Sequence, residues 1–239
     1  MIDQSKNCPE NAIDDNHIKF IALLMSLKKT EISNHSAQRR KQLLEAACAV
    51  IARRGLSGIT VNDIASEAGC SYGVIAFHFK TKERLLLAAL NLVASNYEAV
   101  WSEAMAAAPS SPAERLRILL EVDFDPRIAR AADLAVWMAF WDEAPRVTAY
   151  KRRCSELKRR SLQSITDLVR ELATLRSLDI DVDAVSQGLY AITDGCWIFG
   201  HVTGQNGPQD RKRYRQICLT FLSAFFPDDF SPAPSVSPR

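Results

Sequence analysis

Apolar residues recur every three or four positions along most of the chain, and this spacing predicts helices. In the first well-defined stretch, residues 37–54, one stripe is apolar. Further helices are predicted at residues 82–107, 113–124, 126–144, 145–175, 182–202 and 209–226. No run alternates apolar and polar residues for long enough to predict a sheet. We therefore expect an all-α protein.

Between the first two of these helices the pattern breaks into short segments. Thr60, with Asp63 three residues on, gives a start signal close to the capping box. Gly69 supplies the positive φ that ends a helix, and Ser71 can start the next one. Thr81 can start the long helix that follows. Two short helices joined by a glycine turn predict a helix-turn-helix, whose second helix enters the major groove of DNA.

Charge is unevenly distributed over the 239 residues. The net charge is +2, but residues 36–90 carry eight Lys or Arg against four Asp or Glu. A basic region favours a polyanion partner, although a solvated charged face has the same composition. Residues 151–160 carry six positive side chains, and we interpret them as the solvated face of a long helix.

Other function classes receive little support. The six cysteines are far apart, without a C-x-x-C pair, so we expect no zinc site, no cofactor and a reducing cytoplasmic location. No stretch approaches the ~20 apolar residues that span a bilayer. Paired carboxylates, a glycine-rich phosphate loop and a Ser/Cys–His arrangement do not stand out, so an enzyme is the weaker alternative.

The chain is expected to have four parts. Residues 1–35 are interpreted as a loosely ordered extension, with Met25 as an alternative start, and residues 36–90 as the helix-turn-helix DNA-binding domain. Residues 91–226 are expected to bind ligand and form the dimer. Residues 227–239 contain four prolines and are expected to be disordered.

A combination of residues over about 50 positions is specific to one family. The matching positions are Thr60, Ile64, Ala65, Ala68, Gly69, Ser71, Gly73, His78, Phe79, Lys82 and Leu85. In this pattern the chain resembles the TetR family of bacterial transcriptional regulators. The resemblance implies a three-helix DNA-binding head on an all-helical ligand-binding and dimerisation body. Ala76 departs from it, because the family often has a tyrosine there that contacts a DNA phosphate.

The body resembles a narrower group within that family. The similar segments are Glu121-Val122-Asp123-Phe124-Asp125, Trp137-Met138-Ala139-Phe140-Trp141 and Asp194-Gly195-Cys196-Trp197. They are similar to the BetI type, the choline-responsive repressors of glycine betaine synthesis. The resemblance implies choline as the effector.

The head offers several candidates for contact with a palindromic operator in double-stranded DNA. Lys82 lies in the first turn of a helix, where the backbone N–H groups also attract phosphate. Basic residues at the start of a helix oppose its dipole and hint at an external phosphate. Ordinary solvated side chains are the alternative. The candidate DNA-binding residues are Arg39, Arg40, Thr60, Ser71, Tyr72, Gly73, Phe77, His78 and Lys82.

Tryptophans dominate the candidate ligand site. Trp137 and Trp141 share one helix face, and Asp194 and Trp197 share another. Three indole rings and a carboxylate suit a quaternary ammonium, because π-faces attract the cation without a hydrogen-bond donor. Asp133 is an alternative counter-charge, and plain core packing is the alternative role for the rings. The expected ligand-binding residues are Trp137, Phe140, Trp141, Asp194 and Trp197.

Small residues line one side of the helix predicted at residues 182–202. Glycine inside a helix costs up to ~1 kcal/mol relative to alanine, and close approach of a partner helix would offset that loss. We therefore expect a four-helix homodimer interface, with packing inside one subunit as the alternative. Its expected residues are Gly188, Ala191, Gly195, Ile217 and Phe221.

Taken together, these features predict a ligand-responsive repressor, with glycine betaine synthesis as the expected pathway. The first alternative is a TetR-type regulator, repressor or activator, of another pathway that senses a different small molecule. A ligand sensor without DNA binding is a further alternative, because of Ala76.

Overall fold

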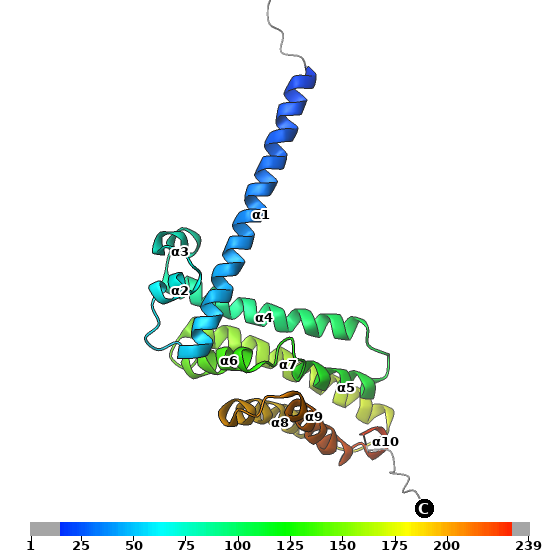
Figure 1. Ribbon diagram of the computed structural model, residues 1–239. Helices are drawn as coiled ribbons and strands as arrows, with labels where there is room; N and C mark the ends of the chain where they lie inside the picture. The colour runs from blue at the N-terminus through cyan, green and yellow to red at the C-terminus, as the bar shows by residue number, and fades with distance from the viewer. Residues whose placement is uncertain (1–14, 231–239) are drawn as a thin grey trace, which may run out of the picture. The chain divides into compact units, whose positions relative to one another are not determined.

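The computed structural model describes residues 15–230 (Figure 1). Every regular element in these residues is a helix, which confirms the predicted all-α fold. None of the described helices is long and apolar enough to cross a membrane. The helices are α1 (Asp15–Arg54), α2 (Val61–Glu67), α3 (Tyr72–Phe79), α4 (Lys82–Ala106), α5 (Pro112–Asp123), α6 (Ala131–Glu143), α7 (Thr148–Leu175), α8 (Val182–Thr203), α9 (Pro208–Ser223) and α10 (Pro227–Phe230).

The chain divides into two units, residues 1–42 and residues 43–239. The described part of the first unit is the beginning of α1, from Asp15. No glycine or proline follows Pro9 until Gly55, so nothing in this stretch interrupts a helix. The predicted loosely ordered extension is therefore wrong for residues 15–35. Residues 1–14 lie outside the described residues.

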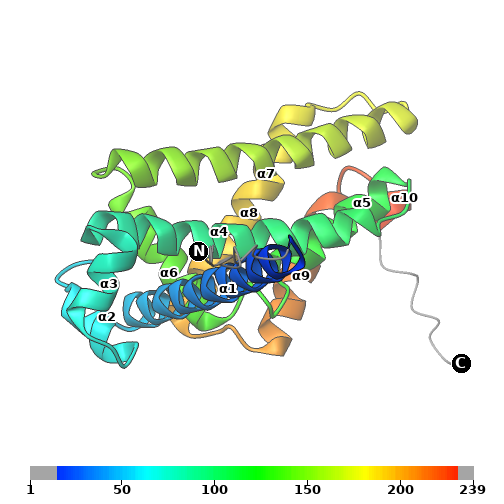
Figure 2. The same ribbon diagram turned by 90° about the horizontal axis from the view of Figure 1, so that it is seen from above.

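The larger of two hydrophobic clusters forms the main core of the second unit, and α7 is its central helix. α7 packs against α4, α5, α6 and α8, and Figure 2 shows it running alongside α4. The end of α1, with α2 and α3, adds Leu43, Ile64 and Ile75 to the same core. The functional boundary predicted near residue 90 falls inside α4, at the fully buried Leu90, and remains a prediction.

Two predicted helix starts were placed too early. α6 begins at Ala131, because the amides of Ile128 and Ala129 donate to the Asp125 carbonyl at 3.0 and 2.9 Å and form a turn. The Asp125 side chain stabilises this turn by accepting a 2.7 Å hydrogen bond from the Arg127 amide. α7 was predicted to begin at Pro145, but it begins three residues later, at Thr148.

The tail is ordered farther than its composition indicates. Residues 227–230 form α10, and Phe230 is buried with its ring 6.3 Å from that of Phe226. The Arg117 guanidinium lies 4.9 Å from the Phe230 ring centre, and Arg176 pairs with Asp229 at 2.6 Å. The predicted disordered tail is thus wrong for residues 227–230, whereas residues 231–239 lie outside the described part.

Candidate functional site

α2 begins with a complete capping box. The Asp63 amide donates to Oγ1 of Thr60 at 3.2 Å, and the Thr60 amide donates to the Asp63 carboxylate at 2.7 Å. The Thr60 hydroxyl also donates to that carboxylate at 2.8 Å. These bonds from Thr60, and one from Arg54, lower the pKa of Asp63. Thr60 therefore has a capping role, and its contact with DNA remains a prediction.

The turn between α2 and α3 is a Schellman motif. Gly69 has φ +58°, the left-handed conformation expected after a helix. The Cys70 amide donates to the Ala65 carbonyl at 2.9 Å, and the Gly69 amide donates to the Ser66 carbonyl at 3.2 Å. This geometry fixes the angle at which α3 leaves α2. The structure thus contains the predicted helix-turn-helix.

α3 exposes one side to solvent and buries the other. The side chains of Tyr72 and Phe77 are 57% and 72% exposed, and Ser71 and Gly73 are exposed beside them, whereas Ile75 is buried. Ser71 is the N-cap residue but makes no side-chain cap bond, so the helix does not use its hydroxyl. The contact of these residues with base edges and thymine methyls remains a prediction.

His78 and Lys82 flank that exposed surface. The His78 ring is half-buried and lies edge-on to Phe77, with 5.2 Å between ring centres. Lys82 is the first residue of α4, after Thr81, whose hydroxyl accepts a 3.2 Å hydrogen bond from the Arg84 amide. Lys82 therefore lies at the positive end of the α4 dipole, as a phosphate contact would require.

Arg39 and Arg40 belong to the first unit. The Arg39 guanidinium donates to the Gln42 side chain at 3.0 Å, and Arg40 is exposed. Their contact with DNA phosphate remains a prediction.

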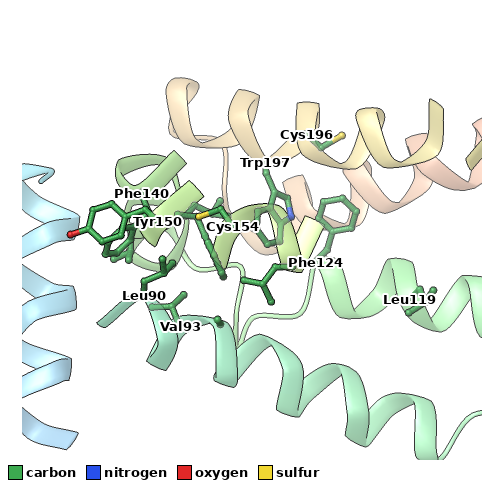
Figure 3. Packing of buried hydrophobic residues seen from close by; sticks show 14 of the residues in the cluster. Leu90, Val93, Leu119, Phe124, Phe140, Tyr150, Cys154, Cys196 and Trp197 are labelled. Atoms are coloured by element: carbon green, nitrogen blue, oxygen red, sulfur yellow. The ribbon is translucent and has the colours of Figure 1, made fainter. Parts of the chain in front are cut away.

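Three of the four tryptophans of the body come together between α6 and α8. The ring centres of Trp137 and Trp141 are 6.2 Å apart. Trp141 and Trp197 stack at 6.2 Å, with only 12° between their planes. In Figure 3 the Trp197 ring extends from α8 into the space between the helices. We call these three residues the tryptophan cage.

Phe140 does not belong to the cage. Its ring is fully buried and packs edge-to-face on Tyr150, with 5.0 Å between ring centres (Figure 3). It is one position from Trp141, so its side chain leaves α6 about 100° away around the helix. The prediction of Phe140 as a ligand-binding residue is therefore corrected: it is a core residue.

A cavity of about 50 Å³ lies against the cage. It is lined by the three tryptophans and by polar side chains from four helices, which are Tyr97, Asp123, Lys158, Ser161, Tyr190, Thr193 and Asp194. Among the described residues, no cluster of His, Cys, Asp and Glu could hold a metal ion. The lining of the cavity combines aromatic and charged side chains, as in sites for small organic molecules.

The predicted counter-charge, Asp194, already has a cationic partner. The Lys158 ammonium lies 2.5 Å from the Asp194 carboxylate and 3.8 Å above the ring centre of Trp141. It is also 5.4 Å from the ring of Tyr190. The interpretation of this lysine as part of a solvated face is thus wrong. Asp133, the alternative counter-charge, pairs instead with Arg130, the N-cap residue of α6, at 2.8 Å.

Asp123 is a second carboxylate of the cavity, and sequence reasoning missed it. Its carboxylate accepts a 2.8 Å hydrogen bond from the Tyr97 hydroxyl. The pKa of Asp123 is raised to about 7, because desolvation and the charge of Asp194 outweigh the opposing effects of the Tyr97 hydrogen bond and of Lys158. The available signal was its place on the apolar stripe of α5, seven residues after Leu116.

The indole N–H groups of the cage differ in their partners. Trp197 donates to the backbone carbonyl of Asp123 at 2.9 Å. The N–H of Trp137 is buried and has no hydrogen-bond partner within the described residues. A buried donor without an acceptor is unfavourable by about 1–3 kcal/mol.

The predicted dimer residues fall into two groups. A Cβ added at Gly188 would lie 2.8 Å from the Phe221 ring, so these two residues pack within one subunit. In contrast, Ala191, Gly195 and Ile217 are exposed, and the space around Gly195 is open. The other exposed large apolar residues of this face are Ile198, Phe199 and Val202.

Known protein families match both the DNA-binding head and the helical body of this chain. Residues 43–89 match the model of bacterial regulatory proteins of the tetR family, and residues 112–227 match the BetI-type transcriptional repressor, C-terminal model. The HTH-type transcriptional regulator BetI of Burkholderia thailandensis is 31% identical over 186 residues, 77% of this chain and 91% of that protein. Its counterpart in Burkholderia ambifaria is 29% identical over 191 residues, 80% and 95% of the two chains.

Two solved structures extend the likeness to the fold. A transcriptional regulator from Pseudomonas aeruginosa PAO1 has a TM-score of 0.69 and 26% identity, over 79% of this chain and 90% of that chain. A transcriptional regulator from Saccharomonospora viridis in complex with choline has a TM-score of 0.66 and 27% identity, over 78% of this chain and 96% of that chain.

These matches confirm a DNA-binding transcriptional repressor and not an enzyme. Regulators of this kind bind DNA operators and small-molecule effectors, typically as dimers. The helix-turn-helix, the helical body and the relatives agree: this chain belongs to the TetR family of transcriptional regulators and carries a BetI-type C-terminal domain.

Proposed function

We propose that the effector is choline or a similar quaternary ammonium, and that the protein represses genes for glycine betaine synthesis. The observation that carries this proposal is the tryptophan cage with two carboxylates, Asp123 and Asp194, in its cavity. The BetI names of the relatives and the choline in one similar structure support the same effector.

The chemistry of the cavity fits this class of ligand. A quaternary ammonium donates no hydrogen bond, so indole faces are good partners and are worth up to about 2 kcal/mol when dry. A carboxylate supplies the opposite charge. The unpartnered N–H of Trp137 offers a donor to the hydroxyl oxygen that choline carries beside its charge.

The DNA-binding form is a homodimer that acts in the cytoplasm on a palindromic operator. The exposed apolar face of α8 and α9, including Gly195, Val202 and Ile217, is the proposed interface. A two-fold axis there would present two copies of α3 to half-sites about one helical turn, ~34–36 Å, apart or at a related spacing.

α4 is the proposed link between effector and operator. It carries Lys82 at the head and Tyr97 at the cavity, 15 residues or ~22 Å apart along one helix. An effector that changes the hydrogen bond between Tyr97 and Asp123 therefore acts on the helix that positions Lys82. The effector shifts the equilibrium between a DNA-binding conformation and a non-binding conformation. It can do so only by as much as its affinities for these two conformations differ.

DNA retardation tests the proposal. The fragment is the intergenic DNA upstream of the protein's own gene, at low ionic strength, with and without choline. We expect retardation by the protein and its reversal by choline, together with a change in tryptophan fluorescence. Trp141→Phe should weaken the response to choline, whereas Trp101→Phe, outside the cavity, should not. A flat fluorescence response up to millimolar choline would refute choline as effector.

A different effector is the second candidate, and Lys158 favours it. The cavity contains a cation of its own, so a zwitterion could pair its carboxylate with Lys158. Parallel titrations with choline and glycine betaine distinguish the two, because only the second ligand carries a carboxylate.

A further inference from the structure

The ammonium group of Lys158 lies where the cage would attract a ligand cation. It contacts the Asp194 carboxylate at 2.5 Å and the face of Trp141 at 3.8 Å. These are the two kinds of partner, anion and π-face, that recognise an alkylammonium. Lys158 comes from α7, whereas Asp194 comes from α8 and Trp141 from α6. One side chain thus connects three helices at the cavity.

We propose that Lys158 is an internal competitor: the cationic head of the effector binds by replacing its ammonium group on Trp141 and Asp194. This inference rests on the proposed function of the same cavity, and it adds that binding is an exchange of cations. Lys158 would then set both the affinity and the selectivity of the site.

Space supports the exchange. The Lys158 ammonium lines the cavity and lies over the face of Trp141, so it occupies the face that a trimethylammonium head would contact. Removal of the Lys158 head group enlarges the cavity at the face of Trp141. The Lys158 side chain is 35% exposed, so its ammonium can move into water while its stem remains on the helix.

Charge supports the exchange as well. With Lys158 in place, Asp194 is neutralised, and Asp123 is the other carboxylate of the cavity. A second cation beside Lys158 would meet a like charge at close range, which is unfavourable in a partly dry site. If the effector takes the place of Lys158, the pairing of Asp194 is preserved and no extra charge is buried.

The exchange also explains how the cavity could distinguish cations. An effector must bind Trp141 better than a primary ammonium that is already tethered there. Small, strongly hydrated cations fail this comparison, because they lose hydration and gain no apolar contact. A quaternary ammonium makes apolar and cation–π contacts together, so it is the favoured class.

Choline titration of Lys158 variants tests the inference by tryptophan fluorescence and by calorimetry. Lys158→Ala removes the competitor, so we expect the Kd for choline to fall about tenfold. Lys151→Ala, an exposed lysine of the same helix, should leave Kd unchanged. Lys158→Arg keeps a cation that binds both Asp194 and Trp141, and should bind choline no more tightly than the wild type.

The outcomes separate the two proposals. If the wild type binds choline but Lys158→Ala binds it equally or more weakly, the exchange is refuted and choline remains the effector. If wild type and variant both ignore choline, both proposals fail. Tighter binding of glycine betaine to the wild type than to Lys158→Ala would make Lys158 a carboxylate-binding residue and refute the exchange. Thermal unfolding checks the fold, and Lys158→Gln replaces the alanine variant if that variant does not fold.

Discussion

The hydroxyl of Tyr97 donates a 2.8 Å hydrogen bond to the carboxylate of Asp123. This bond joins α4, which begins at the DNA-binding head, to the end of α5 inside the cavity. Asp123 is 26 residues from Tyr97 in the chain, so the contact depends on the tertiary fold. It connects the cavity to the helix that begins at the head, and the first predictions concern it.

Tyr97→Phe should destabilise the protein more at pH 8 than at pH 5. At pH 8 the pKa of Asp123, about 7, leaves its carboxylate ionised, and a desolvated anion without its donor is unfavourable by about 1–3 kcal/mol. At pH 5 the neutral acid depends less on that donor. Urea unfolding at the two pH values measures the difference, and Tyr72→Phe, on the exposed side of α3, is the control. An equal loss at both pH values would contradict this role of the bond.

Asp123 should also make the stability depend on pH. Its pKa rises from 3.8 to about 7 on folding, so the folded state holds a proton that the unfolded state releases. The resulting stabilisation is complete below pH 4 and is lost as pH rises to 7, by at most about 1.4 kcal/mol per pH unit. Asp123→Asn should remove this component of the slope, which unfolding curves between pH 4 and 8 would show. The same slope in the variant would place the titration elsewhere.

Choline affinity should rise between pH 6 and pH 8. A bound cation favours the ionised form of Asp123, so protonation of Asp123 competes with binding. The groups that face Asp123 are Tyr97 from α4, Lys158 from α7, Asp194 and Tyr190 from α8, and Cys218 from α9. Calorimetric titration at several pH values measures the effect, and Asp123→Asn should bind choline more weakly and with a flat pH profile. A variant that keeps the wild-type profile would exclude Asp123 as its origin.

Lys82→Ala should weaken binding to all DNA sequences alike. Lys82 lies at the first position of α4, and loss of one phosphate contact lowers the salt dependence of log K by about one unit. Binding to operator and unrelated DNA at several salt concentrations measures this slope. Lys212→Ala, an exposed lysine on α9, is the control. An unchanged slope would remove Lys82 from the interface.

Gly195→Leu should produce a monomer with weak operator binding. Its new side chain enters open space on the exposed face of α8, so the fold of one subunit should tolerate it. Gly188→Leu is a poor test of the dimer, because its side chain would strike Phe221 of the same subunit. Sedimentation measures the oligomeric state, and thermal unfolding separates loss of the dimer from loss of the fold. A dimeric, folded Gly195→Leu would place the interface elsewhere.

The head was predictable because its determinants are local. The capping box of Thr60 and Asp63 spans four residues, and Gly69 ends α2 through its own backbone conformation. Signals of this kind need no knowledge of the tertiary fold. The prolines were less reliable: Pro126 suits a helix start, but the Asp125–Arg127 turn takes its place.

The cavity was predictable only in part. The spacing of Trp137 and Trp141 fixed their common face, but the same spacing could not show that Phe140 packs on Tyr150. Lys158 and Asp194 are 36 residues apart, and each is compatible with a solvated helix surface. Their pairing arises where α7 crosses α8, and a sequence pattern does not contain that crossing.

The stacked pair of Trp141 and Trp197 gives the molecule a spectroscopic reporter of its own. Two nearly parallel indoles at this separation couple their electronic transitions, and a fixed chiral arrangement of such rings produces a near-ultraviolet circular dichroism band. Any rearrangement that slides one ring past the other would alter the sign or size of that band, without an attached dye and without DNA in the cuvette.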